Sequence, residues 1–330
     1  MKYKFLYIFF ISQIIYSQQF RNITSISDLN EISGNNGVAV ADYDQDGDLD
    51  IFIVSEDGNE NISRLLQNTN NGNFIDVTEN SGINQNLNHE IDLINYDDNG
   101  EFSFDTIEHG DRLSASWGDF NNDGYPDLFL GNAVQSELYK NNGNGTFSNI
   151  TESAGFEISC EKCYIAGALW LDYDLDGYLD IFLSDYNQIS PNKLYRNLGD
   201  ETFQQIDLTD YIENSNSFSA IPIYANDDMY PDIYIANDFD QFNQLLINLE
   251  GQGFVEMAVE YGVEDPFDGM GLTTCDFNND LSLDFFVTNI KENSLYTKET
   301  SNSSFAYTNY SVEANLYDTD WAWGVTFSDF

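Results

Sequence analysis

The chain has 330 residues and carries 57 Asp and Glu against 11 Lys and Arg, a formal net charge of −46. A chain this acidic repels phosphate groups, so we expect no nucleic-acid binding and no docking to anionic membranes. Hydrophobic residues make up 42% of the chain and aromatic residues 15%, which is enough apolar surface for a large core and excludes a disordered acidic tail.

The N-terminus predicts export. Two lysines precede a mostly apolar stretch, residues 5–15, and small or polar residues begin at Ser17. Because a bilayer needs about 20 apolar residues, this shorter stretch is typical of a secretory signal peptide over residues 1–17, with a buried first strand as the alternative. We therefore expect a soluble domain, residues 18–330, that is secreted or held at the cell surface without membrane insertion.

One pattern recurs along the chain: Asp-x-Asp/Asn-x-Asp-Gly-x-x-Asp, followed by an apolar run. Its first positions fall at residues 42, 119, 172, 224, 276 and 329, so the spacings are 77, 53, 52, 52 and 53. A constant period near 50 residues indicates stacked supersecondary units. The single long interval locates an insertion near residues 85–109.

Each repeat also has a second half, in which an Asn/Gly turn and a Phe precede a Thr-containing strand. The four strands expected for the second repeat are Ser114–Gly118, Asp127–Gly131, Glu137–Lys140 and Thr146–Thr151. Four-stranded units at this period are typical of β-propeller blades. The predicted fold is an all-β propeller of about seven blades when complete, with five and a part present. A lone fourth-strand motif at residues 20–24 fits a propeller that its N-terminal strand closes.

The acidic loops predict metal binding. Oxygen ligands at loop positions 1, 3, 5 and 9, with a backbone carbonyl at position 7, can surround a hard cation, and calcium suits such a set better than magnesium. An EF-hand is excluded because its position-12 Glu is replaced here by apolar residues. The predicted ligands of the first three loops are Asp42, Asp44, Asp46 and Asp50; Asp119, Asn121, Asp123 and Asp127; Asp172, Asp174, Asp176 and Asp180.

Two further loops depart from this pattern, so we expect about three to five Ca²⁺ ions. The fifth loop has Leu281 where the turn glycine is expected, and its predicted ligands are Asp276, Asn278, Asp280 and Asp284. The fourth has Tyr224 at position 1 and Met229 at position 6, which leaves Asn226, Asp228 and Asp232. The alternative for any single loop is an ordinary Asp-Gly or Asn-Gly turn.

The repeats resemble FG-GAP/VCBS repeats, the calcium-loop blades of integrin α-subunit propellers and of many secreted bacterial proteins, over nearly all of residues 20–330. The turn at Arg196–Phe203, the Met270-Gly271 pair and the Trp323-Gly324 pair are similar to exported proteins whose propeller precedes an ASPIC/UnbV domain. This resemblance implies a truncated sequence and a role of the cell-adhesion kind. Tyr224 departs from the family's calcium ligands.

The long loops opposite the calcium loops are the candidate recognition sites, because long loops on a rigid scaffold commonly carry binding. Two of them, Ser184–Pro191 and Asn237–Asn243, place Tyr186, Phe239 and Phe242 among Asp and Asn. We favour a non-enzymatic, monomeric extracellular propeller that binds a protein or a glycan, although each loop could also be a plain solvated connector.

The alternative function is a secreted polysaccharide-processing enzyme, either a lyase or a hydrolase. The two histidines, His89 and His109, both lie in the predicted insertion and have no partner identifiable from the sequence. Cys160 and Cys163 form a CxxC that we expect to be a small loop disulfide in an oxidising compartment, with a redox role as the alternative. Cys275 is expected to be a buried small residue.

Overall fold

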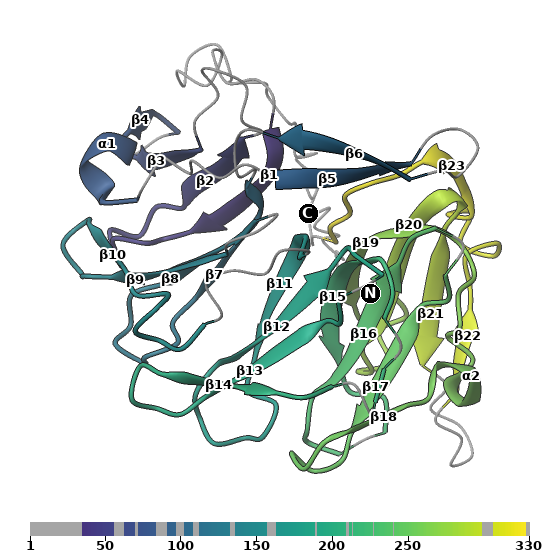
Figure 1. The fold of residues 1–330 in the computed structure, drawn as a ribbon. Coiled ribbons are helices and arrows are strands. Elements are labelled where there is room, and N and C mark those ends of the chain that lie inside the picture. Colours follow the sequence, from purple (N-terminus) through teal and green to yellow (C-terminus); the bar gives the residue numbers. More distant parts are fainter. Residues whose placement is uncertain are drawn as a thin grey trace, which may run out of the picture.

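The computed structural model describes residues 35–55, 63–69, 72–83, 91–96, 102–107, 112–132, 136–156, 163–188, 190–208, 211–212, 214–226, 228–239, 241–298 and 306–327. In these residues the strands form five antiparallel sheets of the same four-stranded order, which follow one another around the molecule (Figure 1). Each sheet is one sequence repeat, so the β-propeller prediction is confirmed. The predicted signal peptide, the motif at residues 20–24 and Asp329 lie outside the described residues.

The five blades are defined by their strands in chain order. Blade one contains β1 (Asn35–Ala41), β2 (Asp50–Ser55), β3 (Arg64–Asn68) and β4 (Phe74–Asp76). Blade two contains β7 (Arg112–Gly118), β8 (Asp127–Asn132), β9 (Glu137–Asn141) and β10 (Phe147–Asn149). Blade three contains β11 (Ile165–Leu171), β12 (Asp180–Asp185), β13 (Lys193–Asn197) and β14 (Phe203–Ile206). Blade four contains β15 (Ser217–Ile223), β16 (Asp232–Asn237), β17 (Gln244–Asn248) and β18 (Phe254–Glu256). Blade five contains β19 (Gly269–Cys275), β20 (Asp284–Glu292), β21 (Ser294–Lys298) and β22 (Tyr307–Asn309).

The second strand of a blade is covered on both faces. All six residues of β8, of β12 and of β16 are buried, because neighbouring sheets pack face to face. Phe129 and Leu138 of blade two, for example, share one core cluster with Ile181 and Tyr195 of blade three. A strand buried on both faces needs a near-continuous apolar run, which is why the residues after each acidic loop are so hydrophobic.

The first strands of successive blades lie side by side, from β1 through β7, β11 and β15 to β19. Small residues make this approach possible: the Ser114 hydroxyl donates to Ile165 O at 3.2 Å, and the Ser219 hydroxyl donates to Met270 O at 2.7 Å. Gly271 occupies the equivalent place in blade five, where an added Cβ would lie 2.3 Å from Trp323 O. The third residue of each first strand therefore sets how closely two blades can meet.

The predicted turn after the fourth strand is a short helix in two blades. Helix α1 (Thr78–Ser81) ends at Gly82 with φ +81°, and α2 (Ala258–Tyr261) ends at Gly262 with φ +71°. Both glycines take the left-handed conformation that commonly ends a helix. A Cβ on Gly82 would also lie 2.5 Å from Phe147 O of the next blade, so the glycine serves both the helix end and the blade contact.

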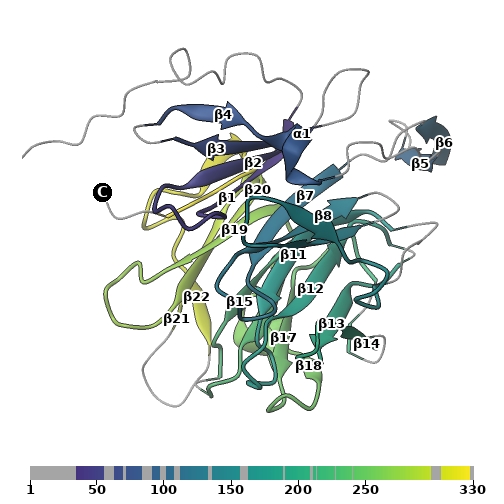
Figure 2. The same cartoon turned by 90° about the vertical axis from the view of Figure 1, so that its left-hand side faces the viewer.

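Two elements stand outside the regular blades. The hairpin of β5 (Ile91–Tyr96) and β6 (Phe102–Ile107) falls within the predicted insertion, and Figure 2 shows it standing away from the sheets. Strand β23 (Asp318–Trp321) pairs antiparallel with the end of β20. Within the described part of the chain, no helix is long and apolar enough to cross a membrane.

Candidate metal centre

The acidic loops each join the first and second strands of a blade. They are loop one (residues 42–50), loop two (119–127), loop three (172–180), loop four (224–232) and loop five (276–284). The turn between the third and fourth strands lies beside each loop: the backbone N–H of Asn197, at the end of β13, donates to Asp180 Oδ1 at 2.8 Å. These two kinds of connection therefore share one face of the propeller, as the alternation of strand direction predicts.

The aspartate at position 1 closes loops one, two, three and five on themselves. In loop one, Asp42 Oδ1 accepts from the backbone N–H of Asp46 and Asp42 Oδ2 from that of Gly47, both at 3.0 Å. The same two bonds occur in loops two, three and five. The turn requires φ of +92° at Gly47, which glycine adopts without steric cost. Leu281 adopts φ +69° at this place in loop five and is 95% exposed, so the loop keeps its shape without the glycine.

The aspartate at position 9 is fully buried in all five loops and ties the loop to the sheet. Asp50 Oδ2 accepts from the backbone N–H of Tyr43 at 3.2 Å, and Asp50 Oδ1 accepts from that of Asn68 at 2.7 Å. Burial, reinforced by nearby loop carboxylates, raises the pKa of Asp50 to about 6, of Asp180 to about 7 and of Asp127 to about 8. These carboxylates are held where a negative charge is costly and a cation would offset the cost.

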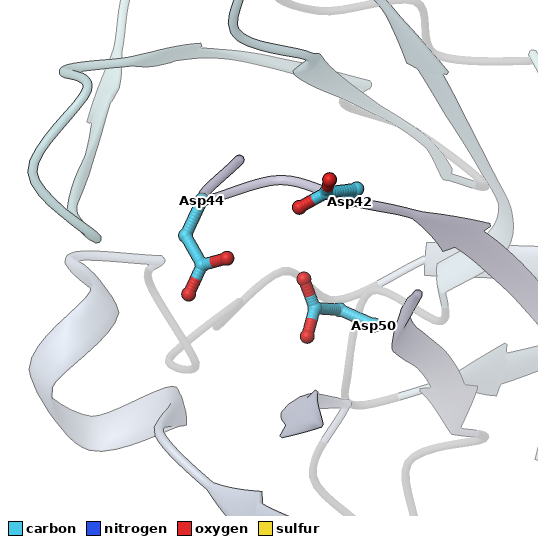
Figure 3. Close-up of side chains that lie close together, drawn as sticks. All are labelled: Asp42, Asp44 and Asp50. Atoms are coloured by element: carbon cyan, nitrogen blue, oxygen red, sulfur yellow. The ribbon is translucent and has the colours of Figure 1, made fainter. Parts of the chain in front are cut away.

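Loops one and three bring acidic side chains together. One oxygen each from Asp42, Asp44 and Asp50 lies within 4.8 Å of the others, and the close-up shows the three carboxylates turned toward one another (Figure 3). Asp172, Asp174 and Asp176 converge in the same way in loop three. Both groups consist of predicted ligands. Asp46 and Asp180, also predicted ligands, lie in these loops but outside the convergent groups.

Loop three contains a further feature that fits a cation. Asp174 Oδ1 is buried and, among the described residues, accepts no hydrogen bond. A buried acceptor without a donor is costly unless something else meets its charge. Carboxylate and carbonyl oxygens at these positions are the donor set that hard divalent cations prefer. The residues of loops one and three thus fit calcium, which would neutralise the converging charges and fix the loop.

The next-to-last residue of the third strand contacts carboxylates of the acidic loop in blades one and three. In blade three, Arg196 forms ion pairs with Asp174 at 2.5 Å and with Asp176 at 3.0 Å. In blade one the same strand position is Gln67, whose side-chain amide donates to Asp44 Oδ2 at 2.5 Å. Loop three therefore has a built-in positive charge beside its predicted ligands, whereas loop one has a neutral amide at the same place.

Loops two and five have asparagine at position 3. The side-chain amide of Asn121 donates to Asp123 Oδ2, and that of Asn278 to Asp280 Oδ2, both at 3.0 Å. Loop two and loop five otherwise keep the backbone bonds to Asp119 and Asp276 at position 1 and the buried Asp127 and Asp284 at position 9. They preserve the loop shape with one fewer negative charge.

Loop four lacks the position-1 carboxylate. The Asn226 amide donates to Asp228 Oδ2 at 2.7 Å, and Asp232 makes the usual buried bonds to the N–H groups of Ala225 and Asn248. The Lys298 ammonium of the next blade donates to Tyr224 O at 2.7 Å. The positive charge of Lys298 therefore offsets part of the negative charge of loop four, which a metal ion would otherwise do.

The asparagine that ends the third strand makes a contact between blades that the sequence pattern did not predict. The side-chain amide of Asn197 donates to Leu179 O of its own loop at 3.0 Å and to Phe120 O of the preceding blade's loop at 2.8 Å. Asn141 and Asn248 make the same pair of bonds to their own and the preceding loops. The repeated Asn is visible in the sequence, but the pattern there predicts only the Asn/Gly turn that follows it and not a contact between blades.

The remaining predicted residues are the aromatic residues of the long loops, the cysteines and the histidines. Tyr186 and Phe239 lie in ring contact, with centroids 5.8 Å apart, and Phe242 is 54% exposed. Cys163 is disulfide-bonded and Cys275 is a free cysteine. Cys160 and the two histidines, His89 and His109, lie outside the described residues, so the predicted disulfide partner and the catalytic alternative stay predictions.

Comparison with known proteins identifies the repeats. Residues 119–161 and 172–235 match the model of the FG-GAP-like repeat, and the chain therefore contains FG-GAP-like repeats on a propeller fold. A curated relative, cartilage acidic protein 1 of Xenopus tropicalis, is 26% identical over 181 residues. That match covers 53% of this chain but only 24% of the relative. The narrower resemblance to proteins with an ASPIC/UnbV domain stays a prediction.

Two solved structures are also similar. One is an Agrocybe aegerita lectin that recognises non-reducing terminal N-acetylglucosamine, with a TM-score of 0.47, 16% identity and coverage of 83% of this chain and 65% of the lectin. The other is the biofilm matrix protein Bap1 of V. cholerae, with a TM-score of 0.43, 12% identity and coverage of 82% of this chain and 38% of Bap1.

Proposed function

We propose that the protein is an extracellular, calcium-stabilised propeller that acts as a non-enzymatic binding module for another macromolecule. The observation that carries the calcium part is the convergence of three carboxylates in loop one and again in loop three. Like charges at this separation repel one another unless a cation lies between them. The orphaned, buried Asp174 Oδ1 supports the same conclusion.

Three observations support a location outside the cell. Residues 1–17 have the pattern of a signal peptide, and the disulfide at Cys163 suits an oxidising compartment. The curated relative takes its name from cartilage and from its acidity, and this chain carries a net charge of −46. A strongly acidic surface keeps such a protein soluble.

Thermal unfolding with and without calcium tests the metal. Calcium at about 100 times its dissociation constant should add about 2.7 kcal/mol per independent site to the free energy of unfolding, and a chelator should remove the gain. Magnesium at the same concentration should give a smaller shift, because it requires a stricter octahedron. Equal melting temperatures in calcium and in chelator would contradict the proposal.

A pair of variants with the same charge change makes this test specific. Asp42→Asn alters the position-1 ligand of loop one, whereas Asp48→Asn removes a charge at position 7, where only the backbone carbonyl is a predicted ligand. We expect the calcium-dependent shift to decrease in the first variant and to persist in the second. Equal losses in both would mean that calcium acts through general charge screening.

A panel of polysaccharides separates the binding module from the enzyme. A polysaccharide-processing enzyme must release product, which reducing-end or unsaturated-product assays detect. Binding without product in the presence of calcium supports the module, and steady turnover would overturn the non-enzymatic assignment.

A further inference from the structure

A row of aromatic rings crosses the face opposite the acidic loops. We define this aromatic row as Tyr164, Tyr186, Phe218, Phe239 and Trp323. The ring centroids are 5.7 Å apart for Tyr164 and Tyr186, 5.6 Å for Tyr186 and Phe218, 5.8 Å for Tyr186 and Phe239, and 5.6 Å for Phe218 and Trp323. The row is therefore continuous from blade three through blade four to the segment after β23.

The backbone holds the row in place. The N–H of Tyr186 donates to Tyr164 O at 2.8 Å, and Tyr186 forms an isolated antiparallel bridge with Asn216, which precedes β15. The N–H of Asp238 donates to Asn216 O at 3.0 Å. These bonds join the loop after β12, the loop after β16 and the start of β15 into one surface.

Two members of the row are open to solvent. The side chain of Phe239 is 47% exposed and that of Trp323 is 52% exposed. Large apolar side chains grouped on a surface commonly mark an interaction site, whereas single ones need no explanation. Because these two rings belong to a connected row that spans blades, the row is a candidate binding surface.

One buried carboxylate, Asp238, lies behind the rings and is 5% exposed. The Tyr186 hydroxyl donates to Asp238 Oδ2, and Asp238 Oδ1 accepts from the N–H of Phe239 at 2.7 Å. Burial, followed by the hydrogen bond to Asp238 and the charge of Asp238, raises the pKa of Tyr186, so the phenol stays protonated and keeps donating. A phenol that donates to a carboxylate carries more negative charge on its ring, which strengthens the attraction of the ring for a cation.

We propose that the aromatic row, with Asp238 beside it, binds a protein segment that presents lysine or arginine side chains. Charge complementarity favours this partner: the rings attract a cation through their faces, Asp238 attracts it through its charge, and the chain as a whole is strongly negative. A neutral glycan would also stack on the rings but would gain nothing from the carboxylate charge. The inference rests on the proposed role as a binding module and names its partner.

The experiment uses a short glycine-rich peptide with two lysines, the same peptide with norleucine in place of lysine, and a neutral N-acetylglucosamine oligosaccharide. Binding to the full chain is measured by calorimetry in saturating calcium at two salt concentrations. We expect the lysine peptide to bind, its affinity to fall as salt rises, and the norleucine peptide and the oligosaccharide to bind at least tenfold more weakly. Tighter binding of the oligosaccharide would overturn the proposal.

Variants locate the site. Trp323→Ala and Phe239→Ala should each weaken binding of the lysine peptide about 2- to 30-fold, the range of a single cation–π contact. Asp238→Asn should weaken it while still accepting the Tyr186 hydroxyl. Tyr310→Ala, which removes a 42% exposed ring that is not part of the row, should change nothing. Equal binding by all four variants, with melting temperatures unchanged, would mean that the peptide binds the acidic surface diffusely and not the row.

The outcome can be separated from that of the calcium proposal. The acidic loops and the aromatic row lie on opposite faces, so the melting shift with calcium is measured independently of peptide binding. Loss of peptide binding in Trp323→Ala with an unchanged calcium shift supports both proposals. An absent calcium shift with intact, row-dependent peptide binding would overturn the calcium proposal alone.

Discussion

Replacing Arg196 by Gln should tighten calcium binding to loop three. The guanidinium lies 2.5 Å from Asp174 and 3.0 Å from Asp176, so it competes with any cation that these carboxylates hold. The substitution gives blade three the residue that blade one already has, because Gln67 occupies the same strand position. The reciprocal change, Gln67→Arg, should weaken loop one.

The expected size follows from the distances. With a calcium–oxygen distance of about 2.4 Å, an ion bound by Asp176 Oδ2, which lies 3.0 Å from Arg196 Nη2, would lie at most about 5.4 Å from that nitrogen. At the dielectric constant of water this repulsion is about 1.5 kcal/mol, and the water value applies because the Arg196 side chain is 38% exposed. Screening at physiological salt reduces it to about 0.8 kcal/mol. Calcium affinity should therefore rise about fourfold at physiological salt and about thirteenfold at low salt.

Calorimetric calcium titration and thermal unfolding test this reasoning together. Without calcium, Arg196→Gln should melt lower than the wild type, because Asp174 and Asp176 lose their counter-charge; with calcium, its melting shift should be larger. Arg64→Gln is the matched control, since Arg64 pairs with Asp76 at 2.7 Å outside the acidic loops and its loss changes the net charge equally. Equal affinities for Arg196→Gln and Arg64→Gln would refute the local competition.

Three further predictions concern the scaffold. Gly131→Ala should lower the free energy of unfolding, measured in urea, by about 1–3 kcal/mol. The reason is that the new Cβ would lie 2.2 Å from Ser114 Oγ and 2.6 Å from Ile165 O. Gly324→Ala is the control and should be near neutral, because a Cβ there would have nothing within 4 Å. Asn197→Ala should lower the free energy of unfolding by about 2–4 kcal/mol, because it removes two donated bonds and the bond that Asn197 Oδ1 accepts from Gly199 N at 2.9 Å. The exposed Asn142, replaced by Ala, is the control. An equal loss of stability in both variants would contradict the contact between blades. Burial raises the pKa of Asp185 to about 6, so between about pH 4 and 6 the native state binds a proton that the unfolded state releases, and stability falls as pH rises through this range. Urea unfolding at pH 5 and pH 7 should therefore show the wild type gaining about 1 kcal/mol on acidification relative to Asp185→Asn; parallel profiles would place the titration elsewhere.

The blade architecture was predictable because each repeat carries its own periodic signals. For the second repeat, the predicted strand Ser114–Gly118 lies inside β7 (Arg112–Gly118), and Asp127–Gly131 ends one residue before β8 does. The fourth strand was predicted too long: Thr146–Thr151 contains β10, which spans Phe147–Asn149 only. Its outer residues turn away because they make contacts with other strands, such as the Thr151 hydroxyl accepting from the N–H of Leu138 at 2.9 Å, and a local pattern does not encode such contacts.

The loops were predictable as loops, but their electrostatics were not. The sequence places four predicted ligands in each of loops one and three, and the structure brings three of the four together in each, a different three in the two loops. The neighbours on the third strand also differ, because Arg196 pairs with the carboxylates at positions 3 and 5 of loop three, whereas Gln67 donates to the carboxylate at position 3 of loop one. Such contacts join residues about 20 positions apart and depend on register, so spacing within the loop cannot reveal them.

The asparagines at the ends of the third strands make the contacts between blades asymmetric along the chain. Asn141, Asn197 and Asn248 each reach back to the loop of the preceding blade, so every loop they contact is anchored by the blade that follows it in the sequence. Peeling a blade away from the C-terminal side removes an anchor from the loop before it, whereas peeling from the N-terminal side leaves the next loop's anchor intact. Loss of a blade at the C-terminal end would therefore loosen the loop of its remaining neighbour, whereas loss of a blade at the N-terminal end would leave the remaining loops anchored.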